Sequence, residues 1–283
     1  MAQSRPLLPF GVTEMDSIVR DAFHSRGITH VGVCDFEATL PLLDVRAKDR
    51  LPGGARSVIV CALPYFSGEY PERNVARYAV CDDYHTAGGA LLEAICGELR
   101  GRLPGYAFVG FIDDSPIREV AAARLAGLGV VGLHGQLILP EFGGYLFIGC
   151  VVTDLALESS QPEAGVCLEC EACLRACPTR ALTREGLVRE RCRSHITQKR
   201  GKLTSWEEEQ IRAGKMVWGC DICLDACPMN KGAKITPLTE LRRNPLPVLS
   251  EEALDYALER KAYGYRGKAV IERNLALILR CDK

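Results

Sequence analysis

Eight cysteines lie between Cys167 and Pro228, seven of them in two groups that each end in Cys-Pro and one, Cys192, between the groups. The first group has the spacing C-x2-C-x2-C-x3-C-P and begins at Cys167. The second has the spacing C-x2-C-x3-C-P and begins at Cys220, and Cys192 upstream supplies the ligand that this group lacks. Thiolates at the first spacing are typical ligands of the two 4Fe-4S clusters of bacterial ferredoxins. The residues therefore predict an iron-sulfur module.

In that spacing the three closely placed cysteines bind one cluster, and the cysteine before proline binds the other. We assign the first cluster to Cys167, Cys170, Cys173 and Cys227. We assign the second cluster to Cys177, Cys192, Cys220 and Cys223. Each cluster then has a complete set of thiolate ligands.

Disulfides and zinc sites are the alternatives, because C-x2-C pairs also bind zinc. The opening MAQSRPLLPF has no apolar run typical of a secretory signal, which disfavours disulfides. Zinc would not require the longer four-cysteine run. We expect the remaining cysteines to be small buried apolar residues in a reducing compartment: Cys34, Cys61, Cys81, Cys96, Cys150 and Cys281.

The composition is that of an ordinary globular protein. The chain has 283 residues, 25% of them charged, and a formal net charge of -1, so no global field indicates nucleic acid or membrane. No segment approaches the roughly 20 apolar residues that span a bilayer. We expect a soluble, cytoplasmic monomer with no membrane partner.

Alternating and helical apolar patterns predict the elements that must position the cysteines. Strands are expected over 28–34, 57–63 and 106–111, with a hairpin joining 137–139 to 145–152. Helices are expected over 13–27, 84–100, 116–127, 250–260 and 269–279, with Ser115 and Ser250 as caps of the third and fourth. Residues 155–166 resemble a linker. The predicted domains are 1–158, 159–240 with the cysteines, and a helical segment 241–283.

Several blocks in order match a known family. They are Leu51-Pro52-Gly53, Ala76-Arg77-Tyr78-Ala79, Asp83-Tyr84-His85, Asp113 with Pro116, Ala126-Gly127-Leu128-Gly129, both cysteine groups, and Arg191-Cys192. The chain resembles the cobalamin-dependent, iron-sulfur epoxyqueuosine reductases, distant relatives of reductive dehalogenases. The resemblance implies an α+β fold: a nitroreductase-like, cobalamin-binding α/β core, then a two-cluster ferredoxin-like domain and a short helical C-terminus.

The resemblance also implies the chemistry. Electrons from an external low-potential donor pass through two 4Fe-4S clusters to cobalamin, and epoxyqueuosine in tRNA is reduced to queuosine. Asp113 occupies the position of the family's proton donor; the alternative is that Asp113 or Asp114 caps the helix expected at Pro116. The residues implied to contact the corrinoid are Arg77, Tyr78, Asp83, Tyr84 and His85.

Asp83, His85 and Gly88 also spell D-x-H-x-x-G, a pattern with which unrelated enzymes bind cobalt through histidine. We interpret this match as chance, because the family resembled here binds its corrinoid without a histidine on cobalt. The chain departs from the family in having Gly132-Leu133-His134 for Gly-Lys-Asn and Met229 for tryptophan, and it ends at Lys283 without the helical-repeat extension of longer members. We expect these departures to affect the substrate more than the redox chemistry.

Two other functions stay open at this point. One is a cobalamin-dependent reductase of a small molecule, in the manner of the dehalogenases or of a corrinoid-handling enzyme. The other is an electron-transfer protein without catalysis of its own. Binding of tRNA requires local basic residues, because phosphate neutralisation dominates RNA affinity. The candidates are Arg189, Arg191, Arg193, Lys199, Arg200, Lys202, Arg242, Arg243, Arg260, Lys261, Arg266 and Lys268.

Overall fold

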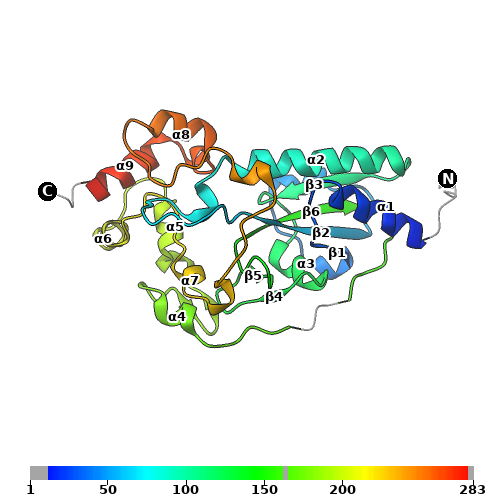
Figure 1. Cartoon of the computed structure of the whole chain (residues 1–283), viewed down its shortest axis with the longest axis horizontal. Coiled ribbons are helices and arrows are strands. Elements are labelled where there is room, and N and C mark those ends of the chain that lie inside the picture. The colour runs from blue at the N-terminus through cyan, green and yellow to red at the C-terminus, as the bar shows by residue number, and fades with distance from the viewer. Residues whose placement is uncertain (1–11, 162–164, 280–283) are drawn as a thin grey trace. The chain divides into compact units, whose positions relative to one another are not determined.

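The computed structural model describes residues 12–161 and 165–279 (Figure 1). The chain forms two compact units, each built from separate stretches of sequence. The first comprises Met1–Leu63, His85–Val130 and Phe147–Gly165, and the second comprises Pro64–Tyr84, Val131–Leu146 and Val166–Lys283. Residues 64–84 and 131–146 therefore group with the cysteine-bearing part of the chain. The predicted functional domains 1–158, 159–240 and 241–283 stay a prediction.

The first unit contains a four-stranded sheet in the order β1-β2-β6-β3 (Figure 1). Its strands are β1 (Val31–Asp35), β2 (Ser57–Pro64), β3 (Phe108–Ile112) and β6 (Leu146–Thr153). β1 pairs antiparallel with β2, and β3 pairs antiparallel with β6. Every residue of β2 is buried, as its unbroken apolar run predicts for a central strand. The three strands expected upstream are confirmed within a few residues.

The predicted hairpin is wrong. β5 (Leu137–Ile138) pairs with β4 (Val130–Val131), whereas β6 lies between β2 and β3 in the larger sheet. Leu139 and Gly143 form only an isolated bridge. The physical reason is burial: six of the eight residues of β6 are buried, and a strand in the middle of a sheet buries more apolar surface than a two-stranded hairpin does.

Over the residues that the structure describes, the first unit has three α-helices: α1 (Val12–His24), α2 (Tyr84–Arg102) and α3 (Glu119–Leu125). α2 approaches the sheet closely where strands carry glycine, since a Cβ at Gly110 would lie 3.1 Å from the Cβ of Leu92. The helix predicted from Pro116 begins instead at Glu119. The Pro116 carbonyl accepts a hydrogen bond from the Leu43 amide (2.8 Å), and the Ser115 hydroxyl accepts from the Ile117 amide (3.1 Å), so residues 115–118 form a turn.

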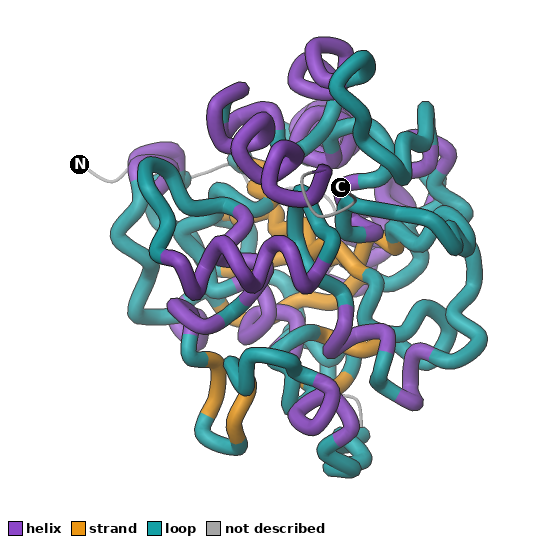
Figure 2. The backbone as a smooth tube through the Cα atoms, turned by 90° about the vertical axis from the view of Figure 1, so that its left-hand side faces the viewer, coloured by secondary structure: helices purple, strands orange, loops and turns teal. Residues whose placement is uncertain are grey.

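The second unit consists mainly of short helices joined by loops. Its helices are α4 (Ala172–Ala176), α5 (Arg193–Thr197), α6 (Ser205–Gly214), α7 (Ile222–Asp225), α8 (Leu254–Arg260) and α9 (Lys268–Leu279). A small ribbon pairs β7 (Leu182–Thr183) with β8 (Gly186–Leu187). Figure 2 shows how much of the backbone is loop and how short most helices are. The 3-10 turns are Glu37–Thr39, Arg46–Arg50, Arg77–Ala79, Arg189–Arg191, Pro228–Asn230, Thr239–Arg242 and Gly264–Arg266.

An apolar core joins these short helices. Trp218 and Tyr263 are almost fully buried with ring centroids 5.8 Å apart, and residues from α5, α6, α8 and α9 pack in the same cluster. The Asn274 side chain donates to the carbonyls of Thr197 (2.7 Å) and Val217 (2.9 Å), which ties α9 to this core. The helix expected over 269–279 is confirmed as α9, whereas α8 begins at Leu254, so Ser250 is not its cap.

None of the helices in the described ranges is both long and apolar enough to cross a membrane.

Candidate functional site

Four thiols surround one pocket in the second unit. They are Cys167, Cys170, Cys173 and Cys227, the set that the spacing assigns to the first cluster. The chain turns between the first three because Glu169 (φ 49°) and Glu171 (φ 57°) adopt the left-handed conformation. The pKa of Cys227 is raised by burial and by the nearby Cys167 and Cys170. Facing thiols that destabilise one another's charge form a donor set suited to a cationic iron cluster.

The structure brings together three of the four cysteines predicted for the second cluster. Burial, then Cys220 and Cys192, raises the pKa of Cys223 to about 12, so these three thiols are near one another. Cys177 is held by its own turn, where its sulfur accepts a hydrogen bond from the Ala181 amide (3.3 Å). Burial opposes ionisation of Cys177, but hydrogen bonds from the Thr179 side chain and neighbouring amides lower its pKa. The ligand role of all eight cysteines stays a prediction.

The structure also bears on the alternatives for the cysteines. Every cysteine in the described ranges is a free thiol, so the disulfide alternative is wrong for them. No three Cys, His, Asp or Glu side chains among the residues described converge on a site for a single metal ion. The buried cysteines expected outside the groups are confirmed at Cys34, Cys61, Cys81, Cys96 and Cys150, and Cys281 lies outside the described residues.

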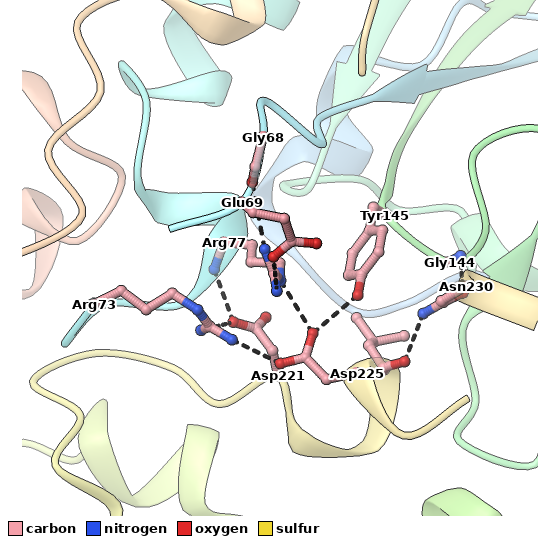
Figure 3. Close-up of polar contacts among 10 residues, drawn as sticks. Gly68, Glu69, Arg73, Arg77, Gly144, Tyr145, Asp221, Asp225 and Asn230 are labelled. Atoms are coloured by element: carbon pink, nitrogen blue, oxygen red, sulfur yellow. Dashed lines mark hydrogen bonds and ion pairs between the residues drawn. The ribbon is translucent and has the colours of Figure 1, made fainter. Parts of the chain in front are cut away.

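Two arginines bind the carboxylates that lie between the cysteines of the second group (Figure 3). Arg73 donates to Asp221 (2.5 Å) and to Asp225 (2.6 Å), and the Arg77 amide also donates to Asp221 (2.8 Å). The Arg77 guanidinium donates to Asp225 (3.0 Å) and to Glu69 (2.9 Å). Since Asp221 and Asp225 adjoin Cys220, Cys223 and Cys227 in sequence, this network ties the loop of the second cysteine group to residues 69–77.

The family resemblance implies that Arg77 contacts a corrinoid, and in the structure its side chain makes contacts within the second unit. Its guanidinium also lies over the rings of Phe66 (5.4 Å) and Tyr145 (5.6 Å), and the Tyr145 hydroxyl donates to Asp225 (2.9 Å). These contacts fix the Arg77 side chain, and its guanidinium uses Nε, Nη1 and Nη2 as hydrogen-bond donors. Arg77 thus supports the neighbouring residues, and its direct contact with a corrinoid stays a prediction.

The next three implied contacts, Tyr78, Asp83 and Tyr84, lie on one anchored segment of the second unit. The rings of Tyr78 and Tyr84 meet edge to face at 6.3 Å, and the Asp83 amide donates to the Arg260 carbonyl (2.8 Å). Neighbouring Asp82 accepts from the buried ammonium of Lys261 (3.4 Å) and from the Asn244 amide group (2.7 Å). These aromatic and polar groups fit a large amphipathic ligand such as a corrinoid.

In the first unit the structure brings His85 and Asp113 together. His85 Nε2 lies 2.9 Å from Asp113 Oδ2, and the Asp113 side chain is 62% exposed. Asp113 adopts a left-handed backbone (φ 61°), which orients its carboxylate just beyond the end of β3. The N-cap of α3 is Arg118, so the alternative role of Asp113 or Asp114 as the helix cap is wrong.

Glu119 is a residue of this cluster that sequence reasoning missed. Its Oε1 accepts a hydrogen bond from the Asp113 amide (2.9 Å). Burial and then the charge of Asp113 raise the pKa of Glu119 to about 8, although the hydrogen bond and His85 oppose the shift. Glu119 therefore carries a proton at neutral pH. The only signal in the sequence was an acidic residue at the start of an apolar helix, which is common at helix N-termini.

Three residues that depart from the family pattern lie at the pocket of the first cysteine group. Leu133, His134 and Met229 line it beside the four thiols. Burial lowers the pKa of His134 to about 4, so its imidazole is neutral. The structure places all three around the first cysteine group, and their effect on the substrate stays a prediction.

Two of the residues proposed for RNA binding are buried. Lys261 has a fully buried side chain and Arg193 is 7% exposed, so neither can reach a phosphate. Lys199 pairs with Glu207, and Lys268 pairs with Asp255 (2.7 Å). Exposed cations remain at Arg189, Arg191, Arg200, Lys202, Arg242, Arg243 and Arg260, and Arg266 is half-buried.

The family model and the similar proteins point to the same family. Residues 46–114 match the family described as "Epoxyqueuosine reductase QueG, DUF1730", and residues 166–230 match the "4Fe-4S double cluster binding domain". An epoxyqueuosine reductase of Lactococcus garvieae is 33% identical over 279 residues, which cover 92% of this chain and 76% of that protein. One from Synechocystis is 36% identical over 191 residues, covering 65% of each chain.

Solved structures agree with this fold. The crystal structure of an epoxyqueuosine reductase with an epoxyqueuosine-modified tRNA-Tyr stem loop superposes with a TM-score of 0.79 at 23% identity, covering 95% of this chain and 82% of that one. The structure of the Streptococcus thermophilus enzyme gives a TM-score of 0.76 at 23% identity, with 93% and 80% coverage. The predicted α+β fold is confirmed.

Proposed function

The chain belongs to the epoxyqueuosine reductase family, and on that premise we propose that it reduces epoxyqueuosine to queuosine in tRNA. The reaction removes the epoxide oxygen as water and therefore consumes two electrons and two protons. The observation that carries the proposal is the 33% identity to an epoxyqueuosine reductase over nearly the whole chain. The cysteine groups alone would fit many electron-transfer proteins.

The second unit supplies the electrons. The match to a double-cluster domain and the donor set support two 4Fe-4S clusters, one within Cys167, Cys170, Cys173 and Cys227 and one within Cys177, Cys192, Cys220 and Cys223. Clusters of this kind transfer electrons singly, so two clusters suit a two-electron reduction. The source of electrons is an external low-potential donor.

Cobalamin is the second cofactor of the proposal, and when bound it would supply reduced cobalt as the site from which electrons reach the substrate. On this chain Tyr78, Asp83, Tyr84 and His85 would hold the corrinoid. The edge-to-face tyrosine pair offers apolar surface, and the Asp82–Lys261 contact keeps their segment fixed without a ligand. Arg77 supports that segment through Asp225 and Asp221.

The proton for the leaving oxygen comes from Asp113 in this proposal. Its carboxylate is exposed and its Oδ2 is hydrogen-bonded to His85 Nε2, so a proton on His85 can pass to Asp113 without rearrangement. Glu119 holds the Asp113 amide and carries a proton of its own at neutral pH. The three groups together can store the two protons that the reaction needs.

The partner is tRNA, bound through exposed cations of the second unit. Arg200 and Lys202 are separated by one glycine, are exposed, and take no part in the ion pair that engages Lys199. A macromolecular substrate with a phosphate backbone would use such residues for affinity. Because tRNA is modified in the cytoplasm, we place the enzyme there, as a monomer.

The decisive experiment is an anaerobic assay with cluster-reconstituted, cobalamin-loaded protein and epoxyqueuosine-containing tRNA. The expected result is conversion of epoxyqueuosine to queuosine, measured by mass spectrometry of the digested nucleosides. Free epoxyqueuosine nucleoside serves as the matched small substrate. Protein that binds clusters and cobalamin but converts neither substrate contradicts the proposal.

A reductase of a small molecule is the second candidate. The observation that favours it is Leu133, since an uncharged residue stands where the family resemblance led us to expect lysine. In the same assay this candidate predicts equal turnover of the free nucleoside and of tRNA. A strong preference for tRNA excludes it.

A further inference from the structure

His134 lines the pocket of the first cysteine group, and one of its ring nitrogens has no hydrogen-bond partner in the described part of the chain. The ring lines the pocket together with Cys167, Cys170, Cys173 and Cys227. The residue is 6% exposed, and its Nε2 has no hydrogen-bond partner among the residues that the structure describes. Buried polar groups without partners are costly and uncommon in proteins, so this atom requires an explanation.

The hydrogen bonds of the ring determine which nitrogen carries the proton. The Gln136 amide donates to His134 Nδ1 at 3.2 Å. A ring nitrogen that accepts a hydrogen bond carries no proton, so the imidazole is neutral and the proton lies on Nε2. The unpaired atom is therefore a donor, and it belongs to a ring that lines the same pocket as the four cysteines.

The ring is also held in place. A Cβ at Gly132 would lie 2.7 Å from His134 Cε1 and 2.8 Å from Nε2, so the glycine leaves the room that the imidazole occupies. Ile138 packs at the same place, with its Cδ1 2.9 Å from that Cβ position. Gly132 and Ile138 therefore confine the ring on this side before any ligand binds.

We propose that His134 Nε2 donates a hydrogen bond to a sulfur of the 4Fe-4S cluster bound by Cys167, Cys170, Cys173 and Cys227, and that this bond raises the reduction potential of that cluster above its value without the donor. Hydrogen bonds to cluster sulfurs stabilise the reduced state, which carries more negative charge. The inference rests on the cluster assignment within the proposed function and is independent of the substrate.

Redox titration of the two clusters tests the effect. His134→Phe keeps an aromatic ring and removes the donor, and His24→Phe makes the same change at an exposed histidine of the other unit. Clusters are reduced stepwise and followed by electron paramagnetic resonance, with iron content measured in parallel. The expected result is a shift to lower potential of one cluster in His134→Phe only, with the other cluster and the iron content unchanged. Unchanged potentials of both clusters at full iron content overturn the proposal.

A measurement on the unmutated protein does not depend on how the variant folds. Protein labelled with ¹⁵N-histidine is reduced and examined by pulsed electron paramagnetic resonance for coupling between a cluster and a histidine nitrogen. A weak coupling, as for a hydrogen-bonded nitrogen, is expected. Absence of coupling overturns the proposal, and so does a coupling large enough for direct iron–nitrogen ligation. Protein that takes up no iron contradicts the proposed function as well, whereas full iron content without coupling contradicts only the role of His134.

Discussion

Single residues decide the proton chemistry proposed for the first unit. His85, Asp113 and Glu119 come from a helix start, a strand end and a second helix start. Asp113 faces solvent while its amide is bound by Glu119. The contact with Glu119 uses only the backbone amide of Asp113. The exposed carboxylate of Asp113 can therefore reach a substrate atom while that contact is kept.

Replacing Asp113 tests the proton-donor role. Asp113→Asn keeps the size of the side chain and its partner His85 but removes the acid, and a general acid contributes about 10²- to 10⁴-fold in rate. We expect single-turnover reduction of epoxyqueuosine to slow within that range, with cluster and cobalamin content unchanged. Asp114→Asn, at the exposed neighbouring position, is the control and should react normally. A fully active Asp113→Asn protein would remove Asp113 from the mechanism.

The raised pKa of Glu119 makes a prediction about stability and pH. The folded protein holds this proton up to about pH 8, whereas an unfolded glutamate loses it near its ordinary pKa of 4.5. Unfolding therefore releases a proton in this interval, and stability falls as pH rises, by about 1.4 kcal/mol per pH unit from this group alone. His85, Asp113, Cys61 and Cys150 are the titratable groups near it.

Glu119→Gln removes that proton but keeps an oxygen to accept from the Asp113 amide. We expect the variant to gain stability relative to the unmutated protein as pH rises from 5.5 to 7.5, measured by anaerobic urea unfolding. Glu98→Gln is the control, because Arg26 lowers the pKa of Glu98. Its contribution is present above the unfolded pKa and lost only as pH falls below it, so the control difference should be constant over the same range. A constant difference for Glu119→Gln would contradict the protonated state.

At the scale of elements, the loop of the second cysteine group depends on the arginine network of Figure 3. Asp221 has a side chain only 2% exposed, and Arg73, at 15%, is its charged partner. Burial raises the pKa of Asp221, and Arg73 is the first of the contacts that counteract it. The pair thus holds α7 and its cysteines against residues 73–77.

Breaking this buried pair should be costly, because a buried charge left without its partner destabilises proteins by about 3–5 kcal/mol. We expect Arg73→Met to lower the free energy of unfolding by about 3 kcal/mol and to release iron from the second cluster more readily. Adding Asp221→Asn should restore part of the loss, since the uncompensated charge is then gone. Arg100→Met breaks an exposed pair with Glu93 and should cost less than 1 kcal/mol. Equal costs for the two arginines would contradict the role of burial.

For the whole molecule, binding of tRNA must rely on local cations because the net charge is only -1. Arg200→Glu with Lys202→Glu should weaken tRNA binding and flatten its dependence on salt. Each phosphate contact that is lost lowers the slope of log affinity against log salt by about 0.7–0.9. Arg46→Glu with Lys48→Glu reverses two exposed charges of the first unit and serves as the control. An unchanged slope in the Arg200 and Lys202 variant would contradict their part in the interface.

The sequence by itself determined the redox chemistry and much of the secondary structure. Cysteine spacing grouped Cys167, Cys170, Cys173 with Cys227, and the structure sets those four around one pocket. The strand at 57–63 and the helices from Tyr84 and near Ala269 followed from apolar periodicity. Such features are local, because ligand spacing and burial patterns are written along one stretch of chain.

Tertiary structure alone decided which distant groups meet. Burial beside Asp113 raises the pKa of Glu119, and Lys261 is buried against Asp82. Among the described residues His134 Nε2 has no hydrogen-bond partner, and its ring lines the cysteine pocket. Pairing of β6 with β3 rather than with β5 likewise depends on where the larger apolar surface is buried. The spacing of residues along the chain does not show which side chains are buried or which distant residues meet. The contacts among His85, Asp113 and Glu119, and the place of His134 at the cysteine pocket, were therefore visible only in the folded structure.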